Sequence, residues 1–168
     1  GGLAAQVAVA WHFFHETFDK IDPVISFVIQ DAMKKQILDP YLNTEQYAPH
    51  WWLAFELKKG QVVNNWNPWC NADVILCFLL MEKDPVRLGR ALRQSARSVD
   101  KFIEYVKSDG ACEEGPAYWG HAAGKLYDYL KIMSDASNGR FSFFDHKQVK
   151  DMGEYISHSY VKNRWVVN

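Results

Sequence analysis

The sequence predicts an all-α fold built from antiparallel helical hairpins. Apolar residues recur at helical spacing in several segments, for example Leu88, Leu92 and Val99. An acidic residue followed by proline, as at Asp84-Pro85, separates these segments and is typical of a helix start. No alternation of apolar and polar residues around a tight turn indicates a β-hairpin. Helices joined in pairs by short loops therefore favour a stack of helical hairpins.

The first three expected helices follow from apolar spacing and from their end signals. The first covers residues 4–20 with Val7, Trp11, Phe14 and Phe18 on one face. The second starts at Asp22-Pro23 and ends before Asp39-Pro40. The third covers residues 44–58 with Trp51, Trp52 and Phe55 as its apolar residues, and Gly60 ends it.

The remaining expected helices are bounded by proline, glycine and asparagine. The fourth helix starts with the cap Asn67 and Pro68 and ends at Asp84-Pro85, where the fifth helix begins. The fifth helix ends at Ser108-Asp109-Gly110, and the sixth extends from Ala117 to Asn138-Gly139. The seventh covers residues 146–160 after the cap Asp145. Residues 164–168 are expected to form a strand or a loop.

Composition limits the classes of function. A chain of 168 residues with 48% hydrophobic residues fits one domain with a sizeable core. The formal net charge of -1 gives no bulk attraction for a polyanion, so nucleic acid is not an expected partner. No apolar run is long enough to span a bilayer. Cys70 and Cys77 lie about 10 Å apart along one expected helix, too far for a disulfide.

The stretch QVVNNWNPWCN, residues 61–71, combines amides and indoles at the start of a helix. Because Asn67 is expected to cap that helix, Asn64, Asn65 and Trp66 lie just before its N-terminus, where backbone N–H groups favour an anion. Indoles cover the apolar faces of a sugar ring, and amides bond its oxygens. A sugar carboxylate is thus one expected ligand; the alternative is that these residues only form a turn and the core.

A second loop, DGACEEGPAYWG at residues 109–120, is expected to meet the first. Successive antiparallel helices alternate in direction, so the fourth and sixth helices are parallel and begin at the same end of the domain. The shared rim would hold Asp109, Glu113, Glu114 and Tyr118. Tyr118 is expected in the first turn of the sixth helix, where the helix dipole favours a phenolate.

At these two loops the chain resembles the heparinase II/III-like polysaccharide lyases. The matching residues are Asn64-Asn65-Trp66-Asn67 with Cys70-Asn71, and Asp109-Gly110 with Glu114-Gly115-Pro116, Tyr118 and Trp119. The resemblance implies an incomplete (α/α) toroid across essentially the whole chain. It also implies a C-terminal β-sandwich domain, absent here, that supplies a histidine to the site. The sequence departs from the family at residues 111–113, Ala-Cys-Glu, where an aromatic residue is expected.

The resemblance implies β-elimination at a uronic acid. A base removes the C5 proton, which requires neutralisation of the adjacent carboxylate, and the 4-O leaving group then takes a proton. Tyr118 would be the acid, and the resemblance leaves open whether it is also the base; Asn64 or Asn65 would neutralise the carboxylate. The residues implied to bind substrate are Trp66, Asn67, Asn71, Glu114 and Trp119.

The resemblance also sets expectations for partners and location. The expected substrate is an acidic polysaccharide, either heparin-like or alginate-like, and the protein would be periplasmic or secreted. The chain starts without methionine and shows no signal peptide, so we expect a processed protein or an excised part of one. Without the second domain, the chain alone is expected to fold and to have little or no lyase activity.

Two other classes of function remain open. A glycoside hydrolase on an (α/α) toroid would use two carboxylates, for which Asp73, Glu113 and Glu114 are candidates. A non-catalytic glycan-binding domain would use the tryptophans as stacking surfaces.

Two further patterns have a plain structural interpretation. His12, His15 and Glu16 could share a metal, but no further ligand follows at a recognised spacing, so no metal and no cofactor is expected. The basic residues of the fifth helix are expected to form a solvated face, with a glycosaminoglycan-binding stripe as the alternative. They are Arg87, Arg90, Arg93, Arg97 and Lys101.

Overall fold

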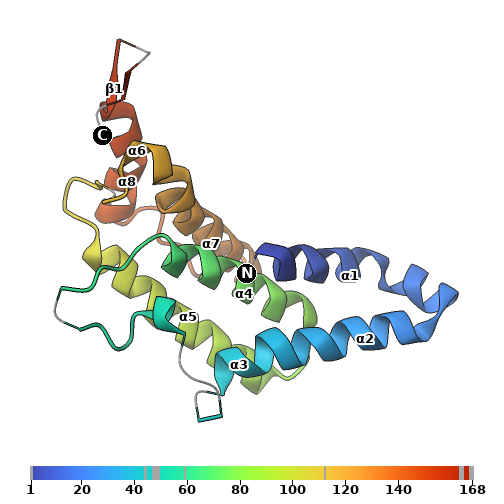
Figure 1. Ribbon diagram of the computed structural model, residues 1–168. Coiled ribbons are helices and arrows are strands. Elements are labelled where there is room, and N and C mark those ends of the chain that lie inside the picture. The colour runs from blue at the N-terminus through green and yellow to red at the C-terminus, as the bar shows by residue number, and fades with distance from the viewer. Residues whose placement is uncertain are drawn as a thin grey trace. The chain divides into compact units, whose positions relative to one another are not determined.

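The chain is helical over most of its length (Figure 1), which confirms the predicted all-α class. The computed structural model describes residues 2–43, 45–46, 50–58, 60–111, 113–162 and 165–166. The chain forms two compact units. The first contains Gly1–His50 and Asp73–Ala96, and the second contains Trp51–Ala72 and Arg97–Asn168. None of the helices in the described residues is both long and apolar enough to cross a membrane.

The first unit begins with a helical hairpin. Helix α1 (Gly2–Ile21) packs against α2 (Pro23–Met33), and Asp22 joins them. As predicted, Asp22 caps α2: its Oδ1 accepts a hydrogen bond of 2.9 Å from the Val24 N–H, and Pro23 occupies the first helical position. Because this capping is local in sequence, it could be read from the residues alone.

The sequence predicted that the second helix ends before Asp39-Pro40, but the helical backbone continues through these residues. It continues as a π-helix, η1 (Lys34–Leu38), and then as α3 (Asp39–Leu42). In the wide turn of η1 the Asp39 N–H bonds to the Lys34 carbonyl, five residues back. Pro40, in the next position, has no N–H to donate to the preceding turn. The wider π-helical turn before it therefore allows the backbone to stay helical through the proline.

Helix α3 is held to the rest of the first unit by side chains from α5 (Pro85–Tyr105). Arg87 bonds both Asp39, at 2.6 Å, and Glu82, at 2.8 Å. Gln94 donates to the Tyr41 carbonyl at 2.6 Å. Arg87, which was predicted to lie on a solvated basic face, is therefore paired with two carboxylates of the first unit that neutralise its charge.

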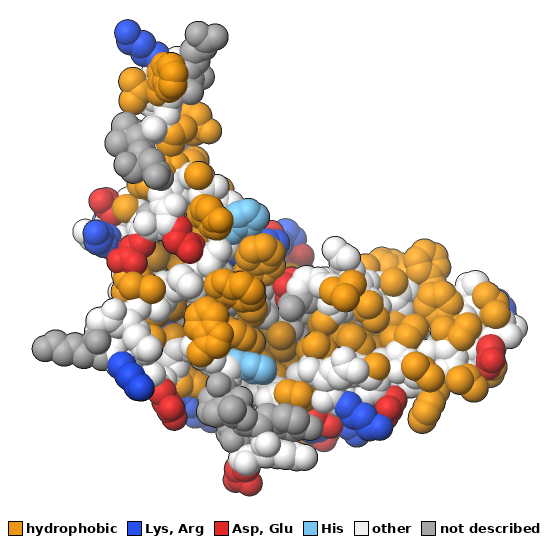
Figure 2. Space-filling model, in the orientation of Figure 1, with side chains coloured by type: hydrophobic (Ala, Val, Ile, Leu, Met, Phe, Trp, Pro, Cys, Tyr) orange, Lys and Arg blue, Asp and Glu red, His pale blue; other side chains and the backbone are white. Residues whose placement is uncertain are grey.

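Both helices of the first hairpin expose large apolar side chains, seen as orange surface over α1 and α2 in Figure 2. The buried face of α1 consists of Ala5, Ala8 and Trp11, while Phe14 of the predicted apolar face is exposed. The exposed large apolar residues of the two helices are Leu3, Phe13, Phe14, Ile21, Val24, Ile25, Phe27 and Val28.

The predicted third helix, residues 44–58, is wrong in its described part. Residues 45–46 form a turn, Trp51–Leu53 form a short 3₁₀ helix, η2, and Ala54 has a positive φ of 59°. Residues 44 and 47–49 lie outside the described residues. The carbonyl oxygens of Trp52 and Leu53 bond to Asn67 and Ser98, far along the chain, instead of to a following helical turn.

A buried amide network forms the polar centre of the second unit. Asn67, 1% exposed, lies in the first turn of α4 (Trp66–Met81). Its Nδ2 lies 2.9 Å from the Trp52 carbonyl and 3.0 Å from both the carbonyl and the Oγ of Ser98 on α5. Asn71 donates to the same Oγ at 2.8 Å and to the Asn67 carbonyl at 2.8 Å. These bonds join α4, α5 and η2.

The predicted sixth helix is broken in two. A single turn, α6 (Gly115–Tyr118), is followed by a 3₁₀ turn, η3 (Trp119–His121), and then by α7 (Ala123–Ala136). Ala122, between η3 and α7, departs from helical geometry with φ -107° and ψ -86°. The Trp119 indole N–H, which donates to the Met152 carbonyl at 2.8 Å, holds the chain at this break. The predicted breaker Asn138-Gly139 follows α7 with positive φ at both residues.

The C-terminal part differs from the predictions in two places. Helix α8 (Lys147–His158) begins after His146, and Asp145 pairs with Lys150 at 3.0 Å instead of capping the helix. A β-hairpin, which the sequence did not indicate, pairs β1 (Tyr160–Val161) with β2 (Trp165–Val166) in antiparallel register. Two-residue strands are too short to show the alternation from which a hairpin is predicted.

The amide network predicts a specific loss of stability. Replacing Asn67 by alanine removes the donors to Trp52 and Ser98, and we expect the free energy of unfolding to fall by about 2–3 kcal/mol. The matched control is Asn43→Ala, because the side chain of this exposed asparagine bonds locally, to Gln46, among the described residues. Its loss should be within about 0.5 kcal/mol. Chemical denaturation measures both; equal losses would contradict the role given to the network.

Candidate functional site

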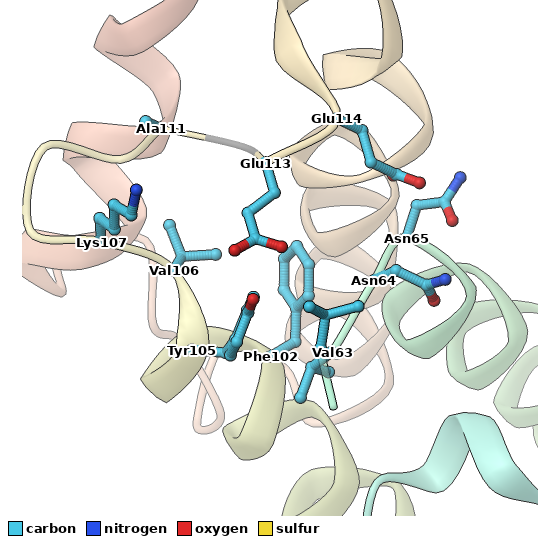
Figure 3. Close-up of a pocket in the computed structure, with 11 residues that line it drawn as sticks. Val63, Asn64, Asn65, Phe102, Tyr105, Val106, Lys107, Ala111, Glu113 and Glu114 are labelled. Carbon is cyan, nitrogen blue, oxygen red and sulfur yellow. The ribbon is translucent and has the colours of Figure 1, made fainter. Parts of the chain in front are cut away.

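The two motif loops line one pocket in the second unit (Figure 3), so the prediction that they meet is confirmed. The pocket has a volume of about 130 Å³. We call it the amide–carboxylate pocket. It is lined by Val62, Val63, Asn64 and Asn65 from the first loop, Phe102, Tyr105, Val106 and Lys107 from the end of α5, and Ala111, Glu113 and Glu114 from the second loop. Apolar walls thus surround a few polar groups, as is usual for a small-molecule site.

The first loop ends in a cap that differs from the predicted one. Helix α4 begins at Trp66, two residues before Pro68, and Asn67 does not cap it. Instead Asn64 Oδ1 accepts from the Trp66 N–H at 3.2 Å, and the Asn65 carbonyl accepts from the Trp69 N–H at 3.2 Å. Pro68 still falls in the first turn, where its missing N–H costs nothing. Both asparagines of the pair are thereby placed at the pocket.

The second loop supplies two carboxylates, and α5 supplies a tyrosine that the sequence did not single out. In Figure 3 the Glu113 carboxylate faces the Tyr105 hydroxyl. Burial and the hydrogen bond to Glu113 raise the pKa of Tyr105 to about 12. Tyr105 therefore stays protonated at neutral pH and donates to Glu113. Its position three residues before Ser108-Asp109-Gly110 was its only sequence signal, and that signal is weak.

Two oxygen atoms at the pocket are buried without a hydrogen-bond donor among the residues that the structure describes. They are Oδ1 of Asn65 and Oε2 of Glu114. Asn65 is only 5% exposed. Figure 3 shows the polar ends of these two side chains turned toward one another. A buried acceptor without a donor costs free energy, so we expect a bound water or another donating group to complete this corner of the pocket.

The turn at Asp109-Gly110 holds the second loop against α8. Asp109 Oδ1 accepts from the Ala111 N–H at 3.0 Å, and Gly110 has a positive φ of 76°. A Cβ on Gly110 would overlap the backbone of Asp151. From α8, Gln148 donates to the carbonyls of Val106, at 2.5 Å, and Lys107, at 2.7 Å. Asp109 shapes the loop and does not line the pocket.

Tyr118 and Trp119 lie beside the pocket rather than in its lining. Tyr118 is the last residue of the single turn α6, so the predicted first turn of a long helix, and with it the dipole argument for a phenolate, is wrong. Its side chain is 52% exposed, and its ring lies 5.7 Å from that of His121. Trp119 is half-buried and bonds the Met152 carbonyl through its indole. Cys112, in the loop before them, lies outside the described residues.

Four exposed rings and one half-buried ring form what we call the aromatic rim. The exposed rings are Trp51, Trp66, Tyr118 and His121, and the half-buried one is Trp69. The Trp51 and Trp66 rings are 6.1 Å apart, and Trp66 is 52% exposed. His121 stacks on Trp69, with ring centroids 5.0 Å apart, and Lys125 lies 5.8 Å from the Trp69 ring centre. His121 was not among the predicted residues; its spacing of three from Tyr118 was the available signal.

Other predicted residues are placed away from the pocket. Asn67 and Asn71 are buried in the amide network, where a polysaccharide cannot reach them. Asp73 belongs to the first unit and does not line the pocket. The part of the chain that the structure describes contains no cluster of three metal-ligating side chains, and His15 instead bonds the His12 carbonyl at 3.1 Å.

Comparison with known proteins gives no relationship: the chain matches no protein-family model and no curated protein sequence at a significant level.

The turn at Gly110 predicts a second loss of stability. Gly110→Ala forces a side chain into a left-handed conformation and against Asp151, so we expect a cost of roughly 2–5 kcal/mol. Gly120→Ala is the matched control, because no atom lies within 4 Å of the Cβ it would add. Thermal and chemical unfolding compare the two variants. If Gly110→Ala were as stable as Gly120→Ala, the close packing of this turn on α8 would be refuted.

Proposed function

We propose that this chain is the helical part of a polysaccharide lyase that cleaves a uronic-acid-containing polysaccharide by β-elimination. The observation that carries the proposal is that both motif loops, far apart in sequence, line the amide–carboxylate pocket. In this proposal the helices belong to an incomplete (α/α) toroid. A C-terminal β-sandwich domain completes the site with a histidine, and the protein acts outside the cytoplasm.

Asn65 is the better candidate to neutralise the uronate carboxylate. Its side-chain amide makes no hydrogen bond to another described residue, whereas the Asn64 side chain is used to cap α4. An amide N–H₂ donates two hydrogen bonds without adding a charge that would compete for the proton at C5. Neutralising the carboxylate lets negative charge spread into it as the proton leaves.

Tyr118 is the proposed acid and base. Its side chain is exposed, and it lies four residues after Glu114, the last pocket-lining residue of the second loop. A substrate lying over the pocket mouth would thus pass Asn65 and Glu114 on its way to Tyr118. The exposed indole of Trp66 is the proposed platform for a neighbouring sugar ring.

A glycoside hydrolase is the second candidate. Glu113 and Glu114 both line the pocket, and paired carboxylates are the usual catalytic groups of hydrolases. The products separate the two reactions, because elimination leaves an unsaturated uronate that absorbs ultraviolet light and hydrolysis leaves saturated sugars.

The first test of the lyase proposal is Tyr118→Phe, assayed in a form of the protein that carries the β-sandwich domain. Loss of the hydroxyl should lower turnover about 10²- to 10⁴-fold while leaving KM and the melting temperature nearly unchanged. Tyr160→Phe is the control, since Tyr160 in β1 is equally exposed at 52%. Formation of unsaturated product is the readout. Wild-type turnover in Tyr118→Phe would remove the tyrosine from the mechanism.

The second test concerns the two tryptophans and uses this chain alone. Trp66→Ala should weaken binding of a uronate oligosaccharide about 2- to 10-fold with little change in stability. Trp119→Ala should instead cost about 3 kcal/mol of stability, because a partly buried ring and its hydrogen bond to Met152 are lost. Calorimetric binding and thermal unfolding distinguish them. A stability loss in Trp66→Ala with unchanged affinity would reject the rim as a binding surface.

A further inference from the structure

Helix α1 has two apolar faces, and only one of them is used within the first unit. Ala5, Ala8 and Trp11 form the buried face. A second row, which we call the α1 seam, is spaced alternately by four and three residues and consists of Leu3, Val7, Ala10, Phe14, Thr17 and Ile21. Residues with this spacing share one side of a helix. All of them are exposed except Val7, which is half-buried.

The apolar surface around the α1 seam is larger than a monomer usually exposes. Phe13, beside the seam, is 72% exposed and Ile21 is 71% exposed. Exposed apolar residues of α2 follow across the hairpin turn, and Figure 2 shows this surface over both helices. At roughly 150–200 Å² for a fully exposed side chain of this size, the large apolar residues of α1 and α2 expose roughly 900 Å² together.

This area matches what a stable dimer needs. The largest apolar patch on a typical monomer covers about 300–600 Å². Each partner in a protein interface of standard size contributes about 800 Å². A contact that covered most of the exposed surface of α1 and α2 would therefore be a full interface and not an incidental one.

The α1 seam is complementary to a second copy of itself in antiparallel orientation. With a two-fold axis at the middle of the helix, the pairs across the axis are Ala10 with Phe14, Val7 with Thr17, and Leu3 with Ile21. Ala10, the smallest residue of the seam, thus receives Phe14, the largest, as knobs-into-holes packing requires. In parallel orientation Phe14 would meet Phe14 and Ala10 would meet Ala10, which places an overlap beside a void.

The charges of the hairpin favour a second copy over a membrane surface. The six residues of the α1 seam are all uncharged, so two copies of the seam meet without repulsion. Around the seam the hairpin is acidic, because one lysine, Lys20, stands against Glu16, Asp19, Asp22 and Asp31. Helices that lie on membranes usually carry Lys and Arg on their polar face. An anionic lipid surface would therefore repel this hairpin.

We infer that the exposed apolar face of the α1–α2 hairpin is a dimer interface, in which the α1 helices of two copies pack antiparallel along the seam. The exposed residues of α2 widen the contact on each side of the two-fold axis. Because the same surface is used by both copies, the contact closes at two chains. The inference is independent of the proposed function, since no residue of α1 or α2 lines the amide–carboxylate pocket.

Sedimentation velocity of the whole 168-residue chain tests the inference. We expect a single dimeric species that is half formed at about 1–10 µM. A monomer at every concentration up to about 100 µM would overturn the inference. Species that grow beyond the dimer without limit would also overturn it, in favour of unspecific apolar association.

Phe14→Glu tests the α1 seam directly. A charge in the middle of the contact should raise the dissociation constant of the dimer at least about 100-fold. The control is Val86→Glu, because Val86 is 70% exposed in the first turn of α5 and lies outside the hairpin. Circular dichroism and melting curves establish that each variant is folded. Wild-type association of folded Phe14→Glu would reject the seam.

Val24→Glu tests the part played by α2. Val24 and Val86 are closely matched, because each follows an Asp-Pro pair at the start of a helix and each is exposed, at 58% and 70%. We expect Val24→Glu to weaken the dimer about tenfold and Val86→Glu to leave it unchanged. Equal association of the two variants would remove α2 from the interface.

Engineered cysteines test the antiparallel register. Under mild oxidation a mixture of the Leu3→Cys and Ile21→Cys chains should form disulfide-linked dimers, whereas Leu3→Cys alone should not, because its two copies lie at opposite ends of the contact. The wild-type chain, in which Cys70 and Cys77 are buried, is the control. Cross-linking of Leu3→Cys to itself as fast as in the mixture would overturn the antiparallel arrangement.

Two other occupants of this face have distinct outcomes. In a longer form extended before residue 1, we expect the dimer and its sensitivity to Phe14→Glu to persist. A monomeric longer form whose melting temperature falls with Phe14→Glu would overturn the inference and assign the face to a further segment of the same polypeptide. Binding of a monomeric chain to phosphatidylcholine vesicles, lost in Phe14→Glu, would overturn it in favour of a lipid surface.

Discussion

The second unit depends on one buried side chain, the amide of Asn67. Desolvating an amide is costly unless its N–H groups find acceptors, and here both are directed at groups far away in sequence. These bonds fix where α4 starts relative to α5 and η2. The starting point of α4 in turn decides where Asn64 and Asn65 lie. An interior hydrogen-bond network thus sets the position of a surface pocket.

That dependence gives the asparagines of the first loop separate tasks. Asn67 and Asn71 hold the helices together, Asn64 caps α4, and Asn65 is left with a buried side-chain oxygen that no described residue satisfies. Natural proteins rarely leave such an atom without reason, and the usual reasons are bound water or a ligand. The same residue type thus completes the interior at one position and lines the pocket two positions away.

The sequence predicted those features whose hydrogen-bond partners lie a few residues apart, and it failed where the partners are far apart in the chain. Asp22 and Asp84 start helices through bonds to residues two positions on, so both starts could be predicted. The meeting of the two loops was predicted from the alternation of helix direction, although the sixth helix of that argument is broken into α6, η3 and α7. The failed third helix and the misplaced cap at Asn67 have a long-range cause, since their backbone and amide groups bond Ser98 on α5. Such a partner cannot be found from spacing.

The attachment of the second loop to α8 has a consequence for the smallest form of this protein that is worth producing. Gln148 and the backbone at Asp151 support the carbonyls and the turn that place Glu113 and Glu114. The indole of Trp119 bonds still further along, at Met152. A chain shortened to end before α8 would retain every residue that lines the cavity, yet would lose the surface on which half of that lining rests. Domain boundaries drawn from the motifs alone would therefore be drawn too early.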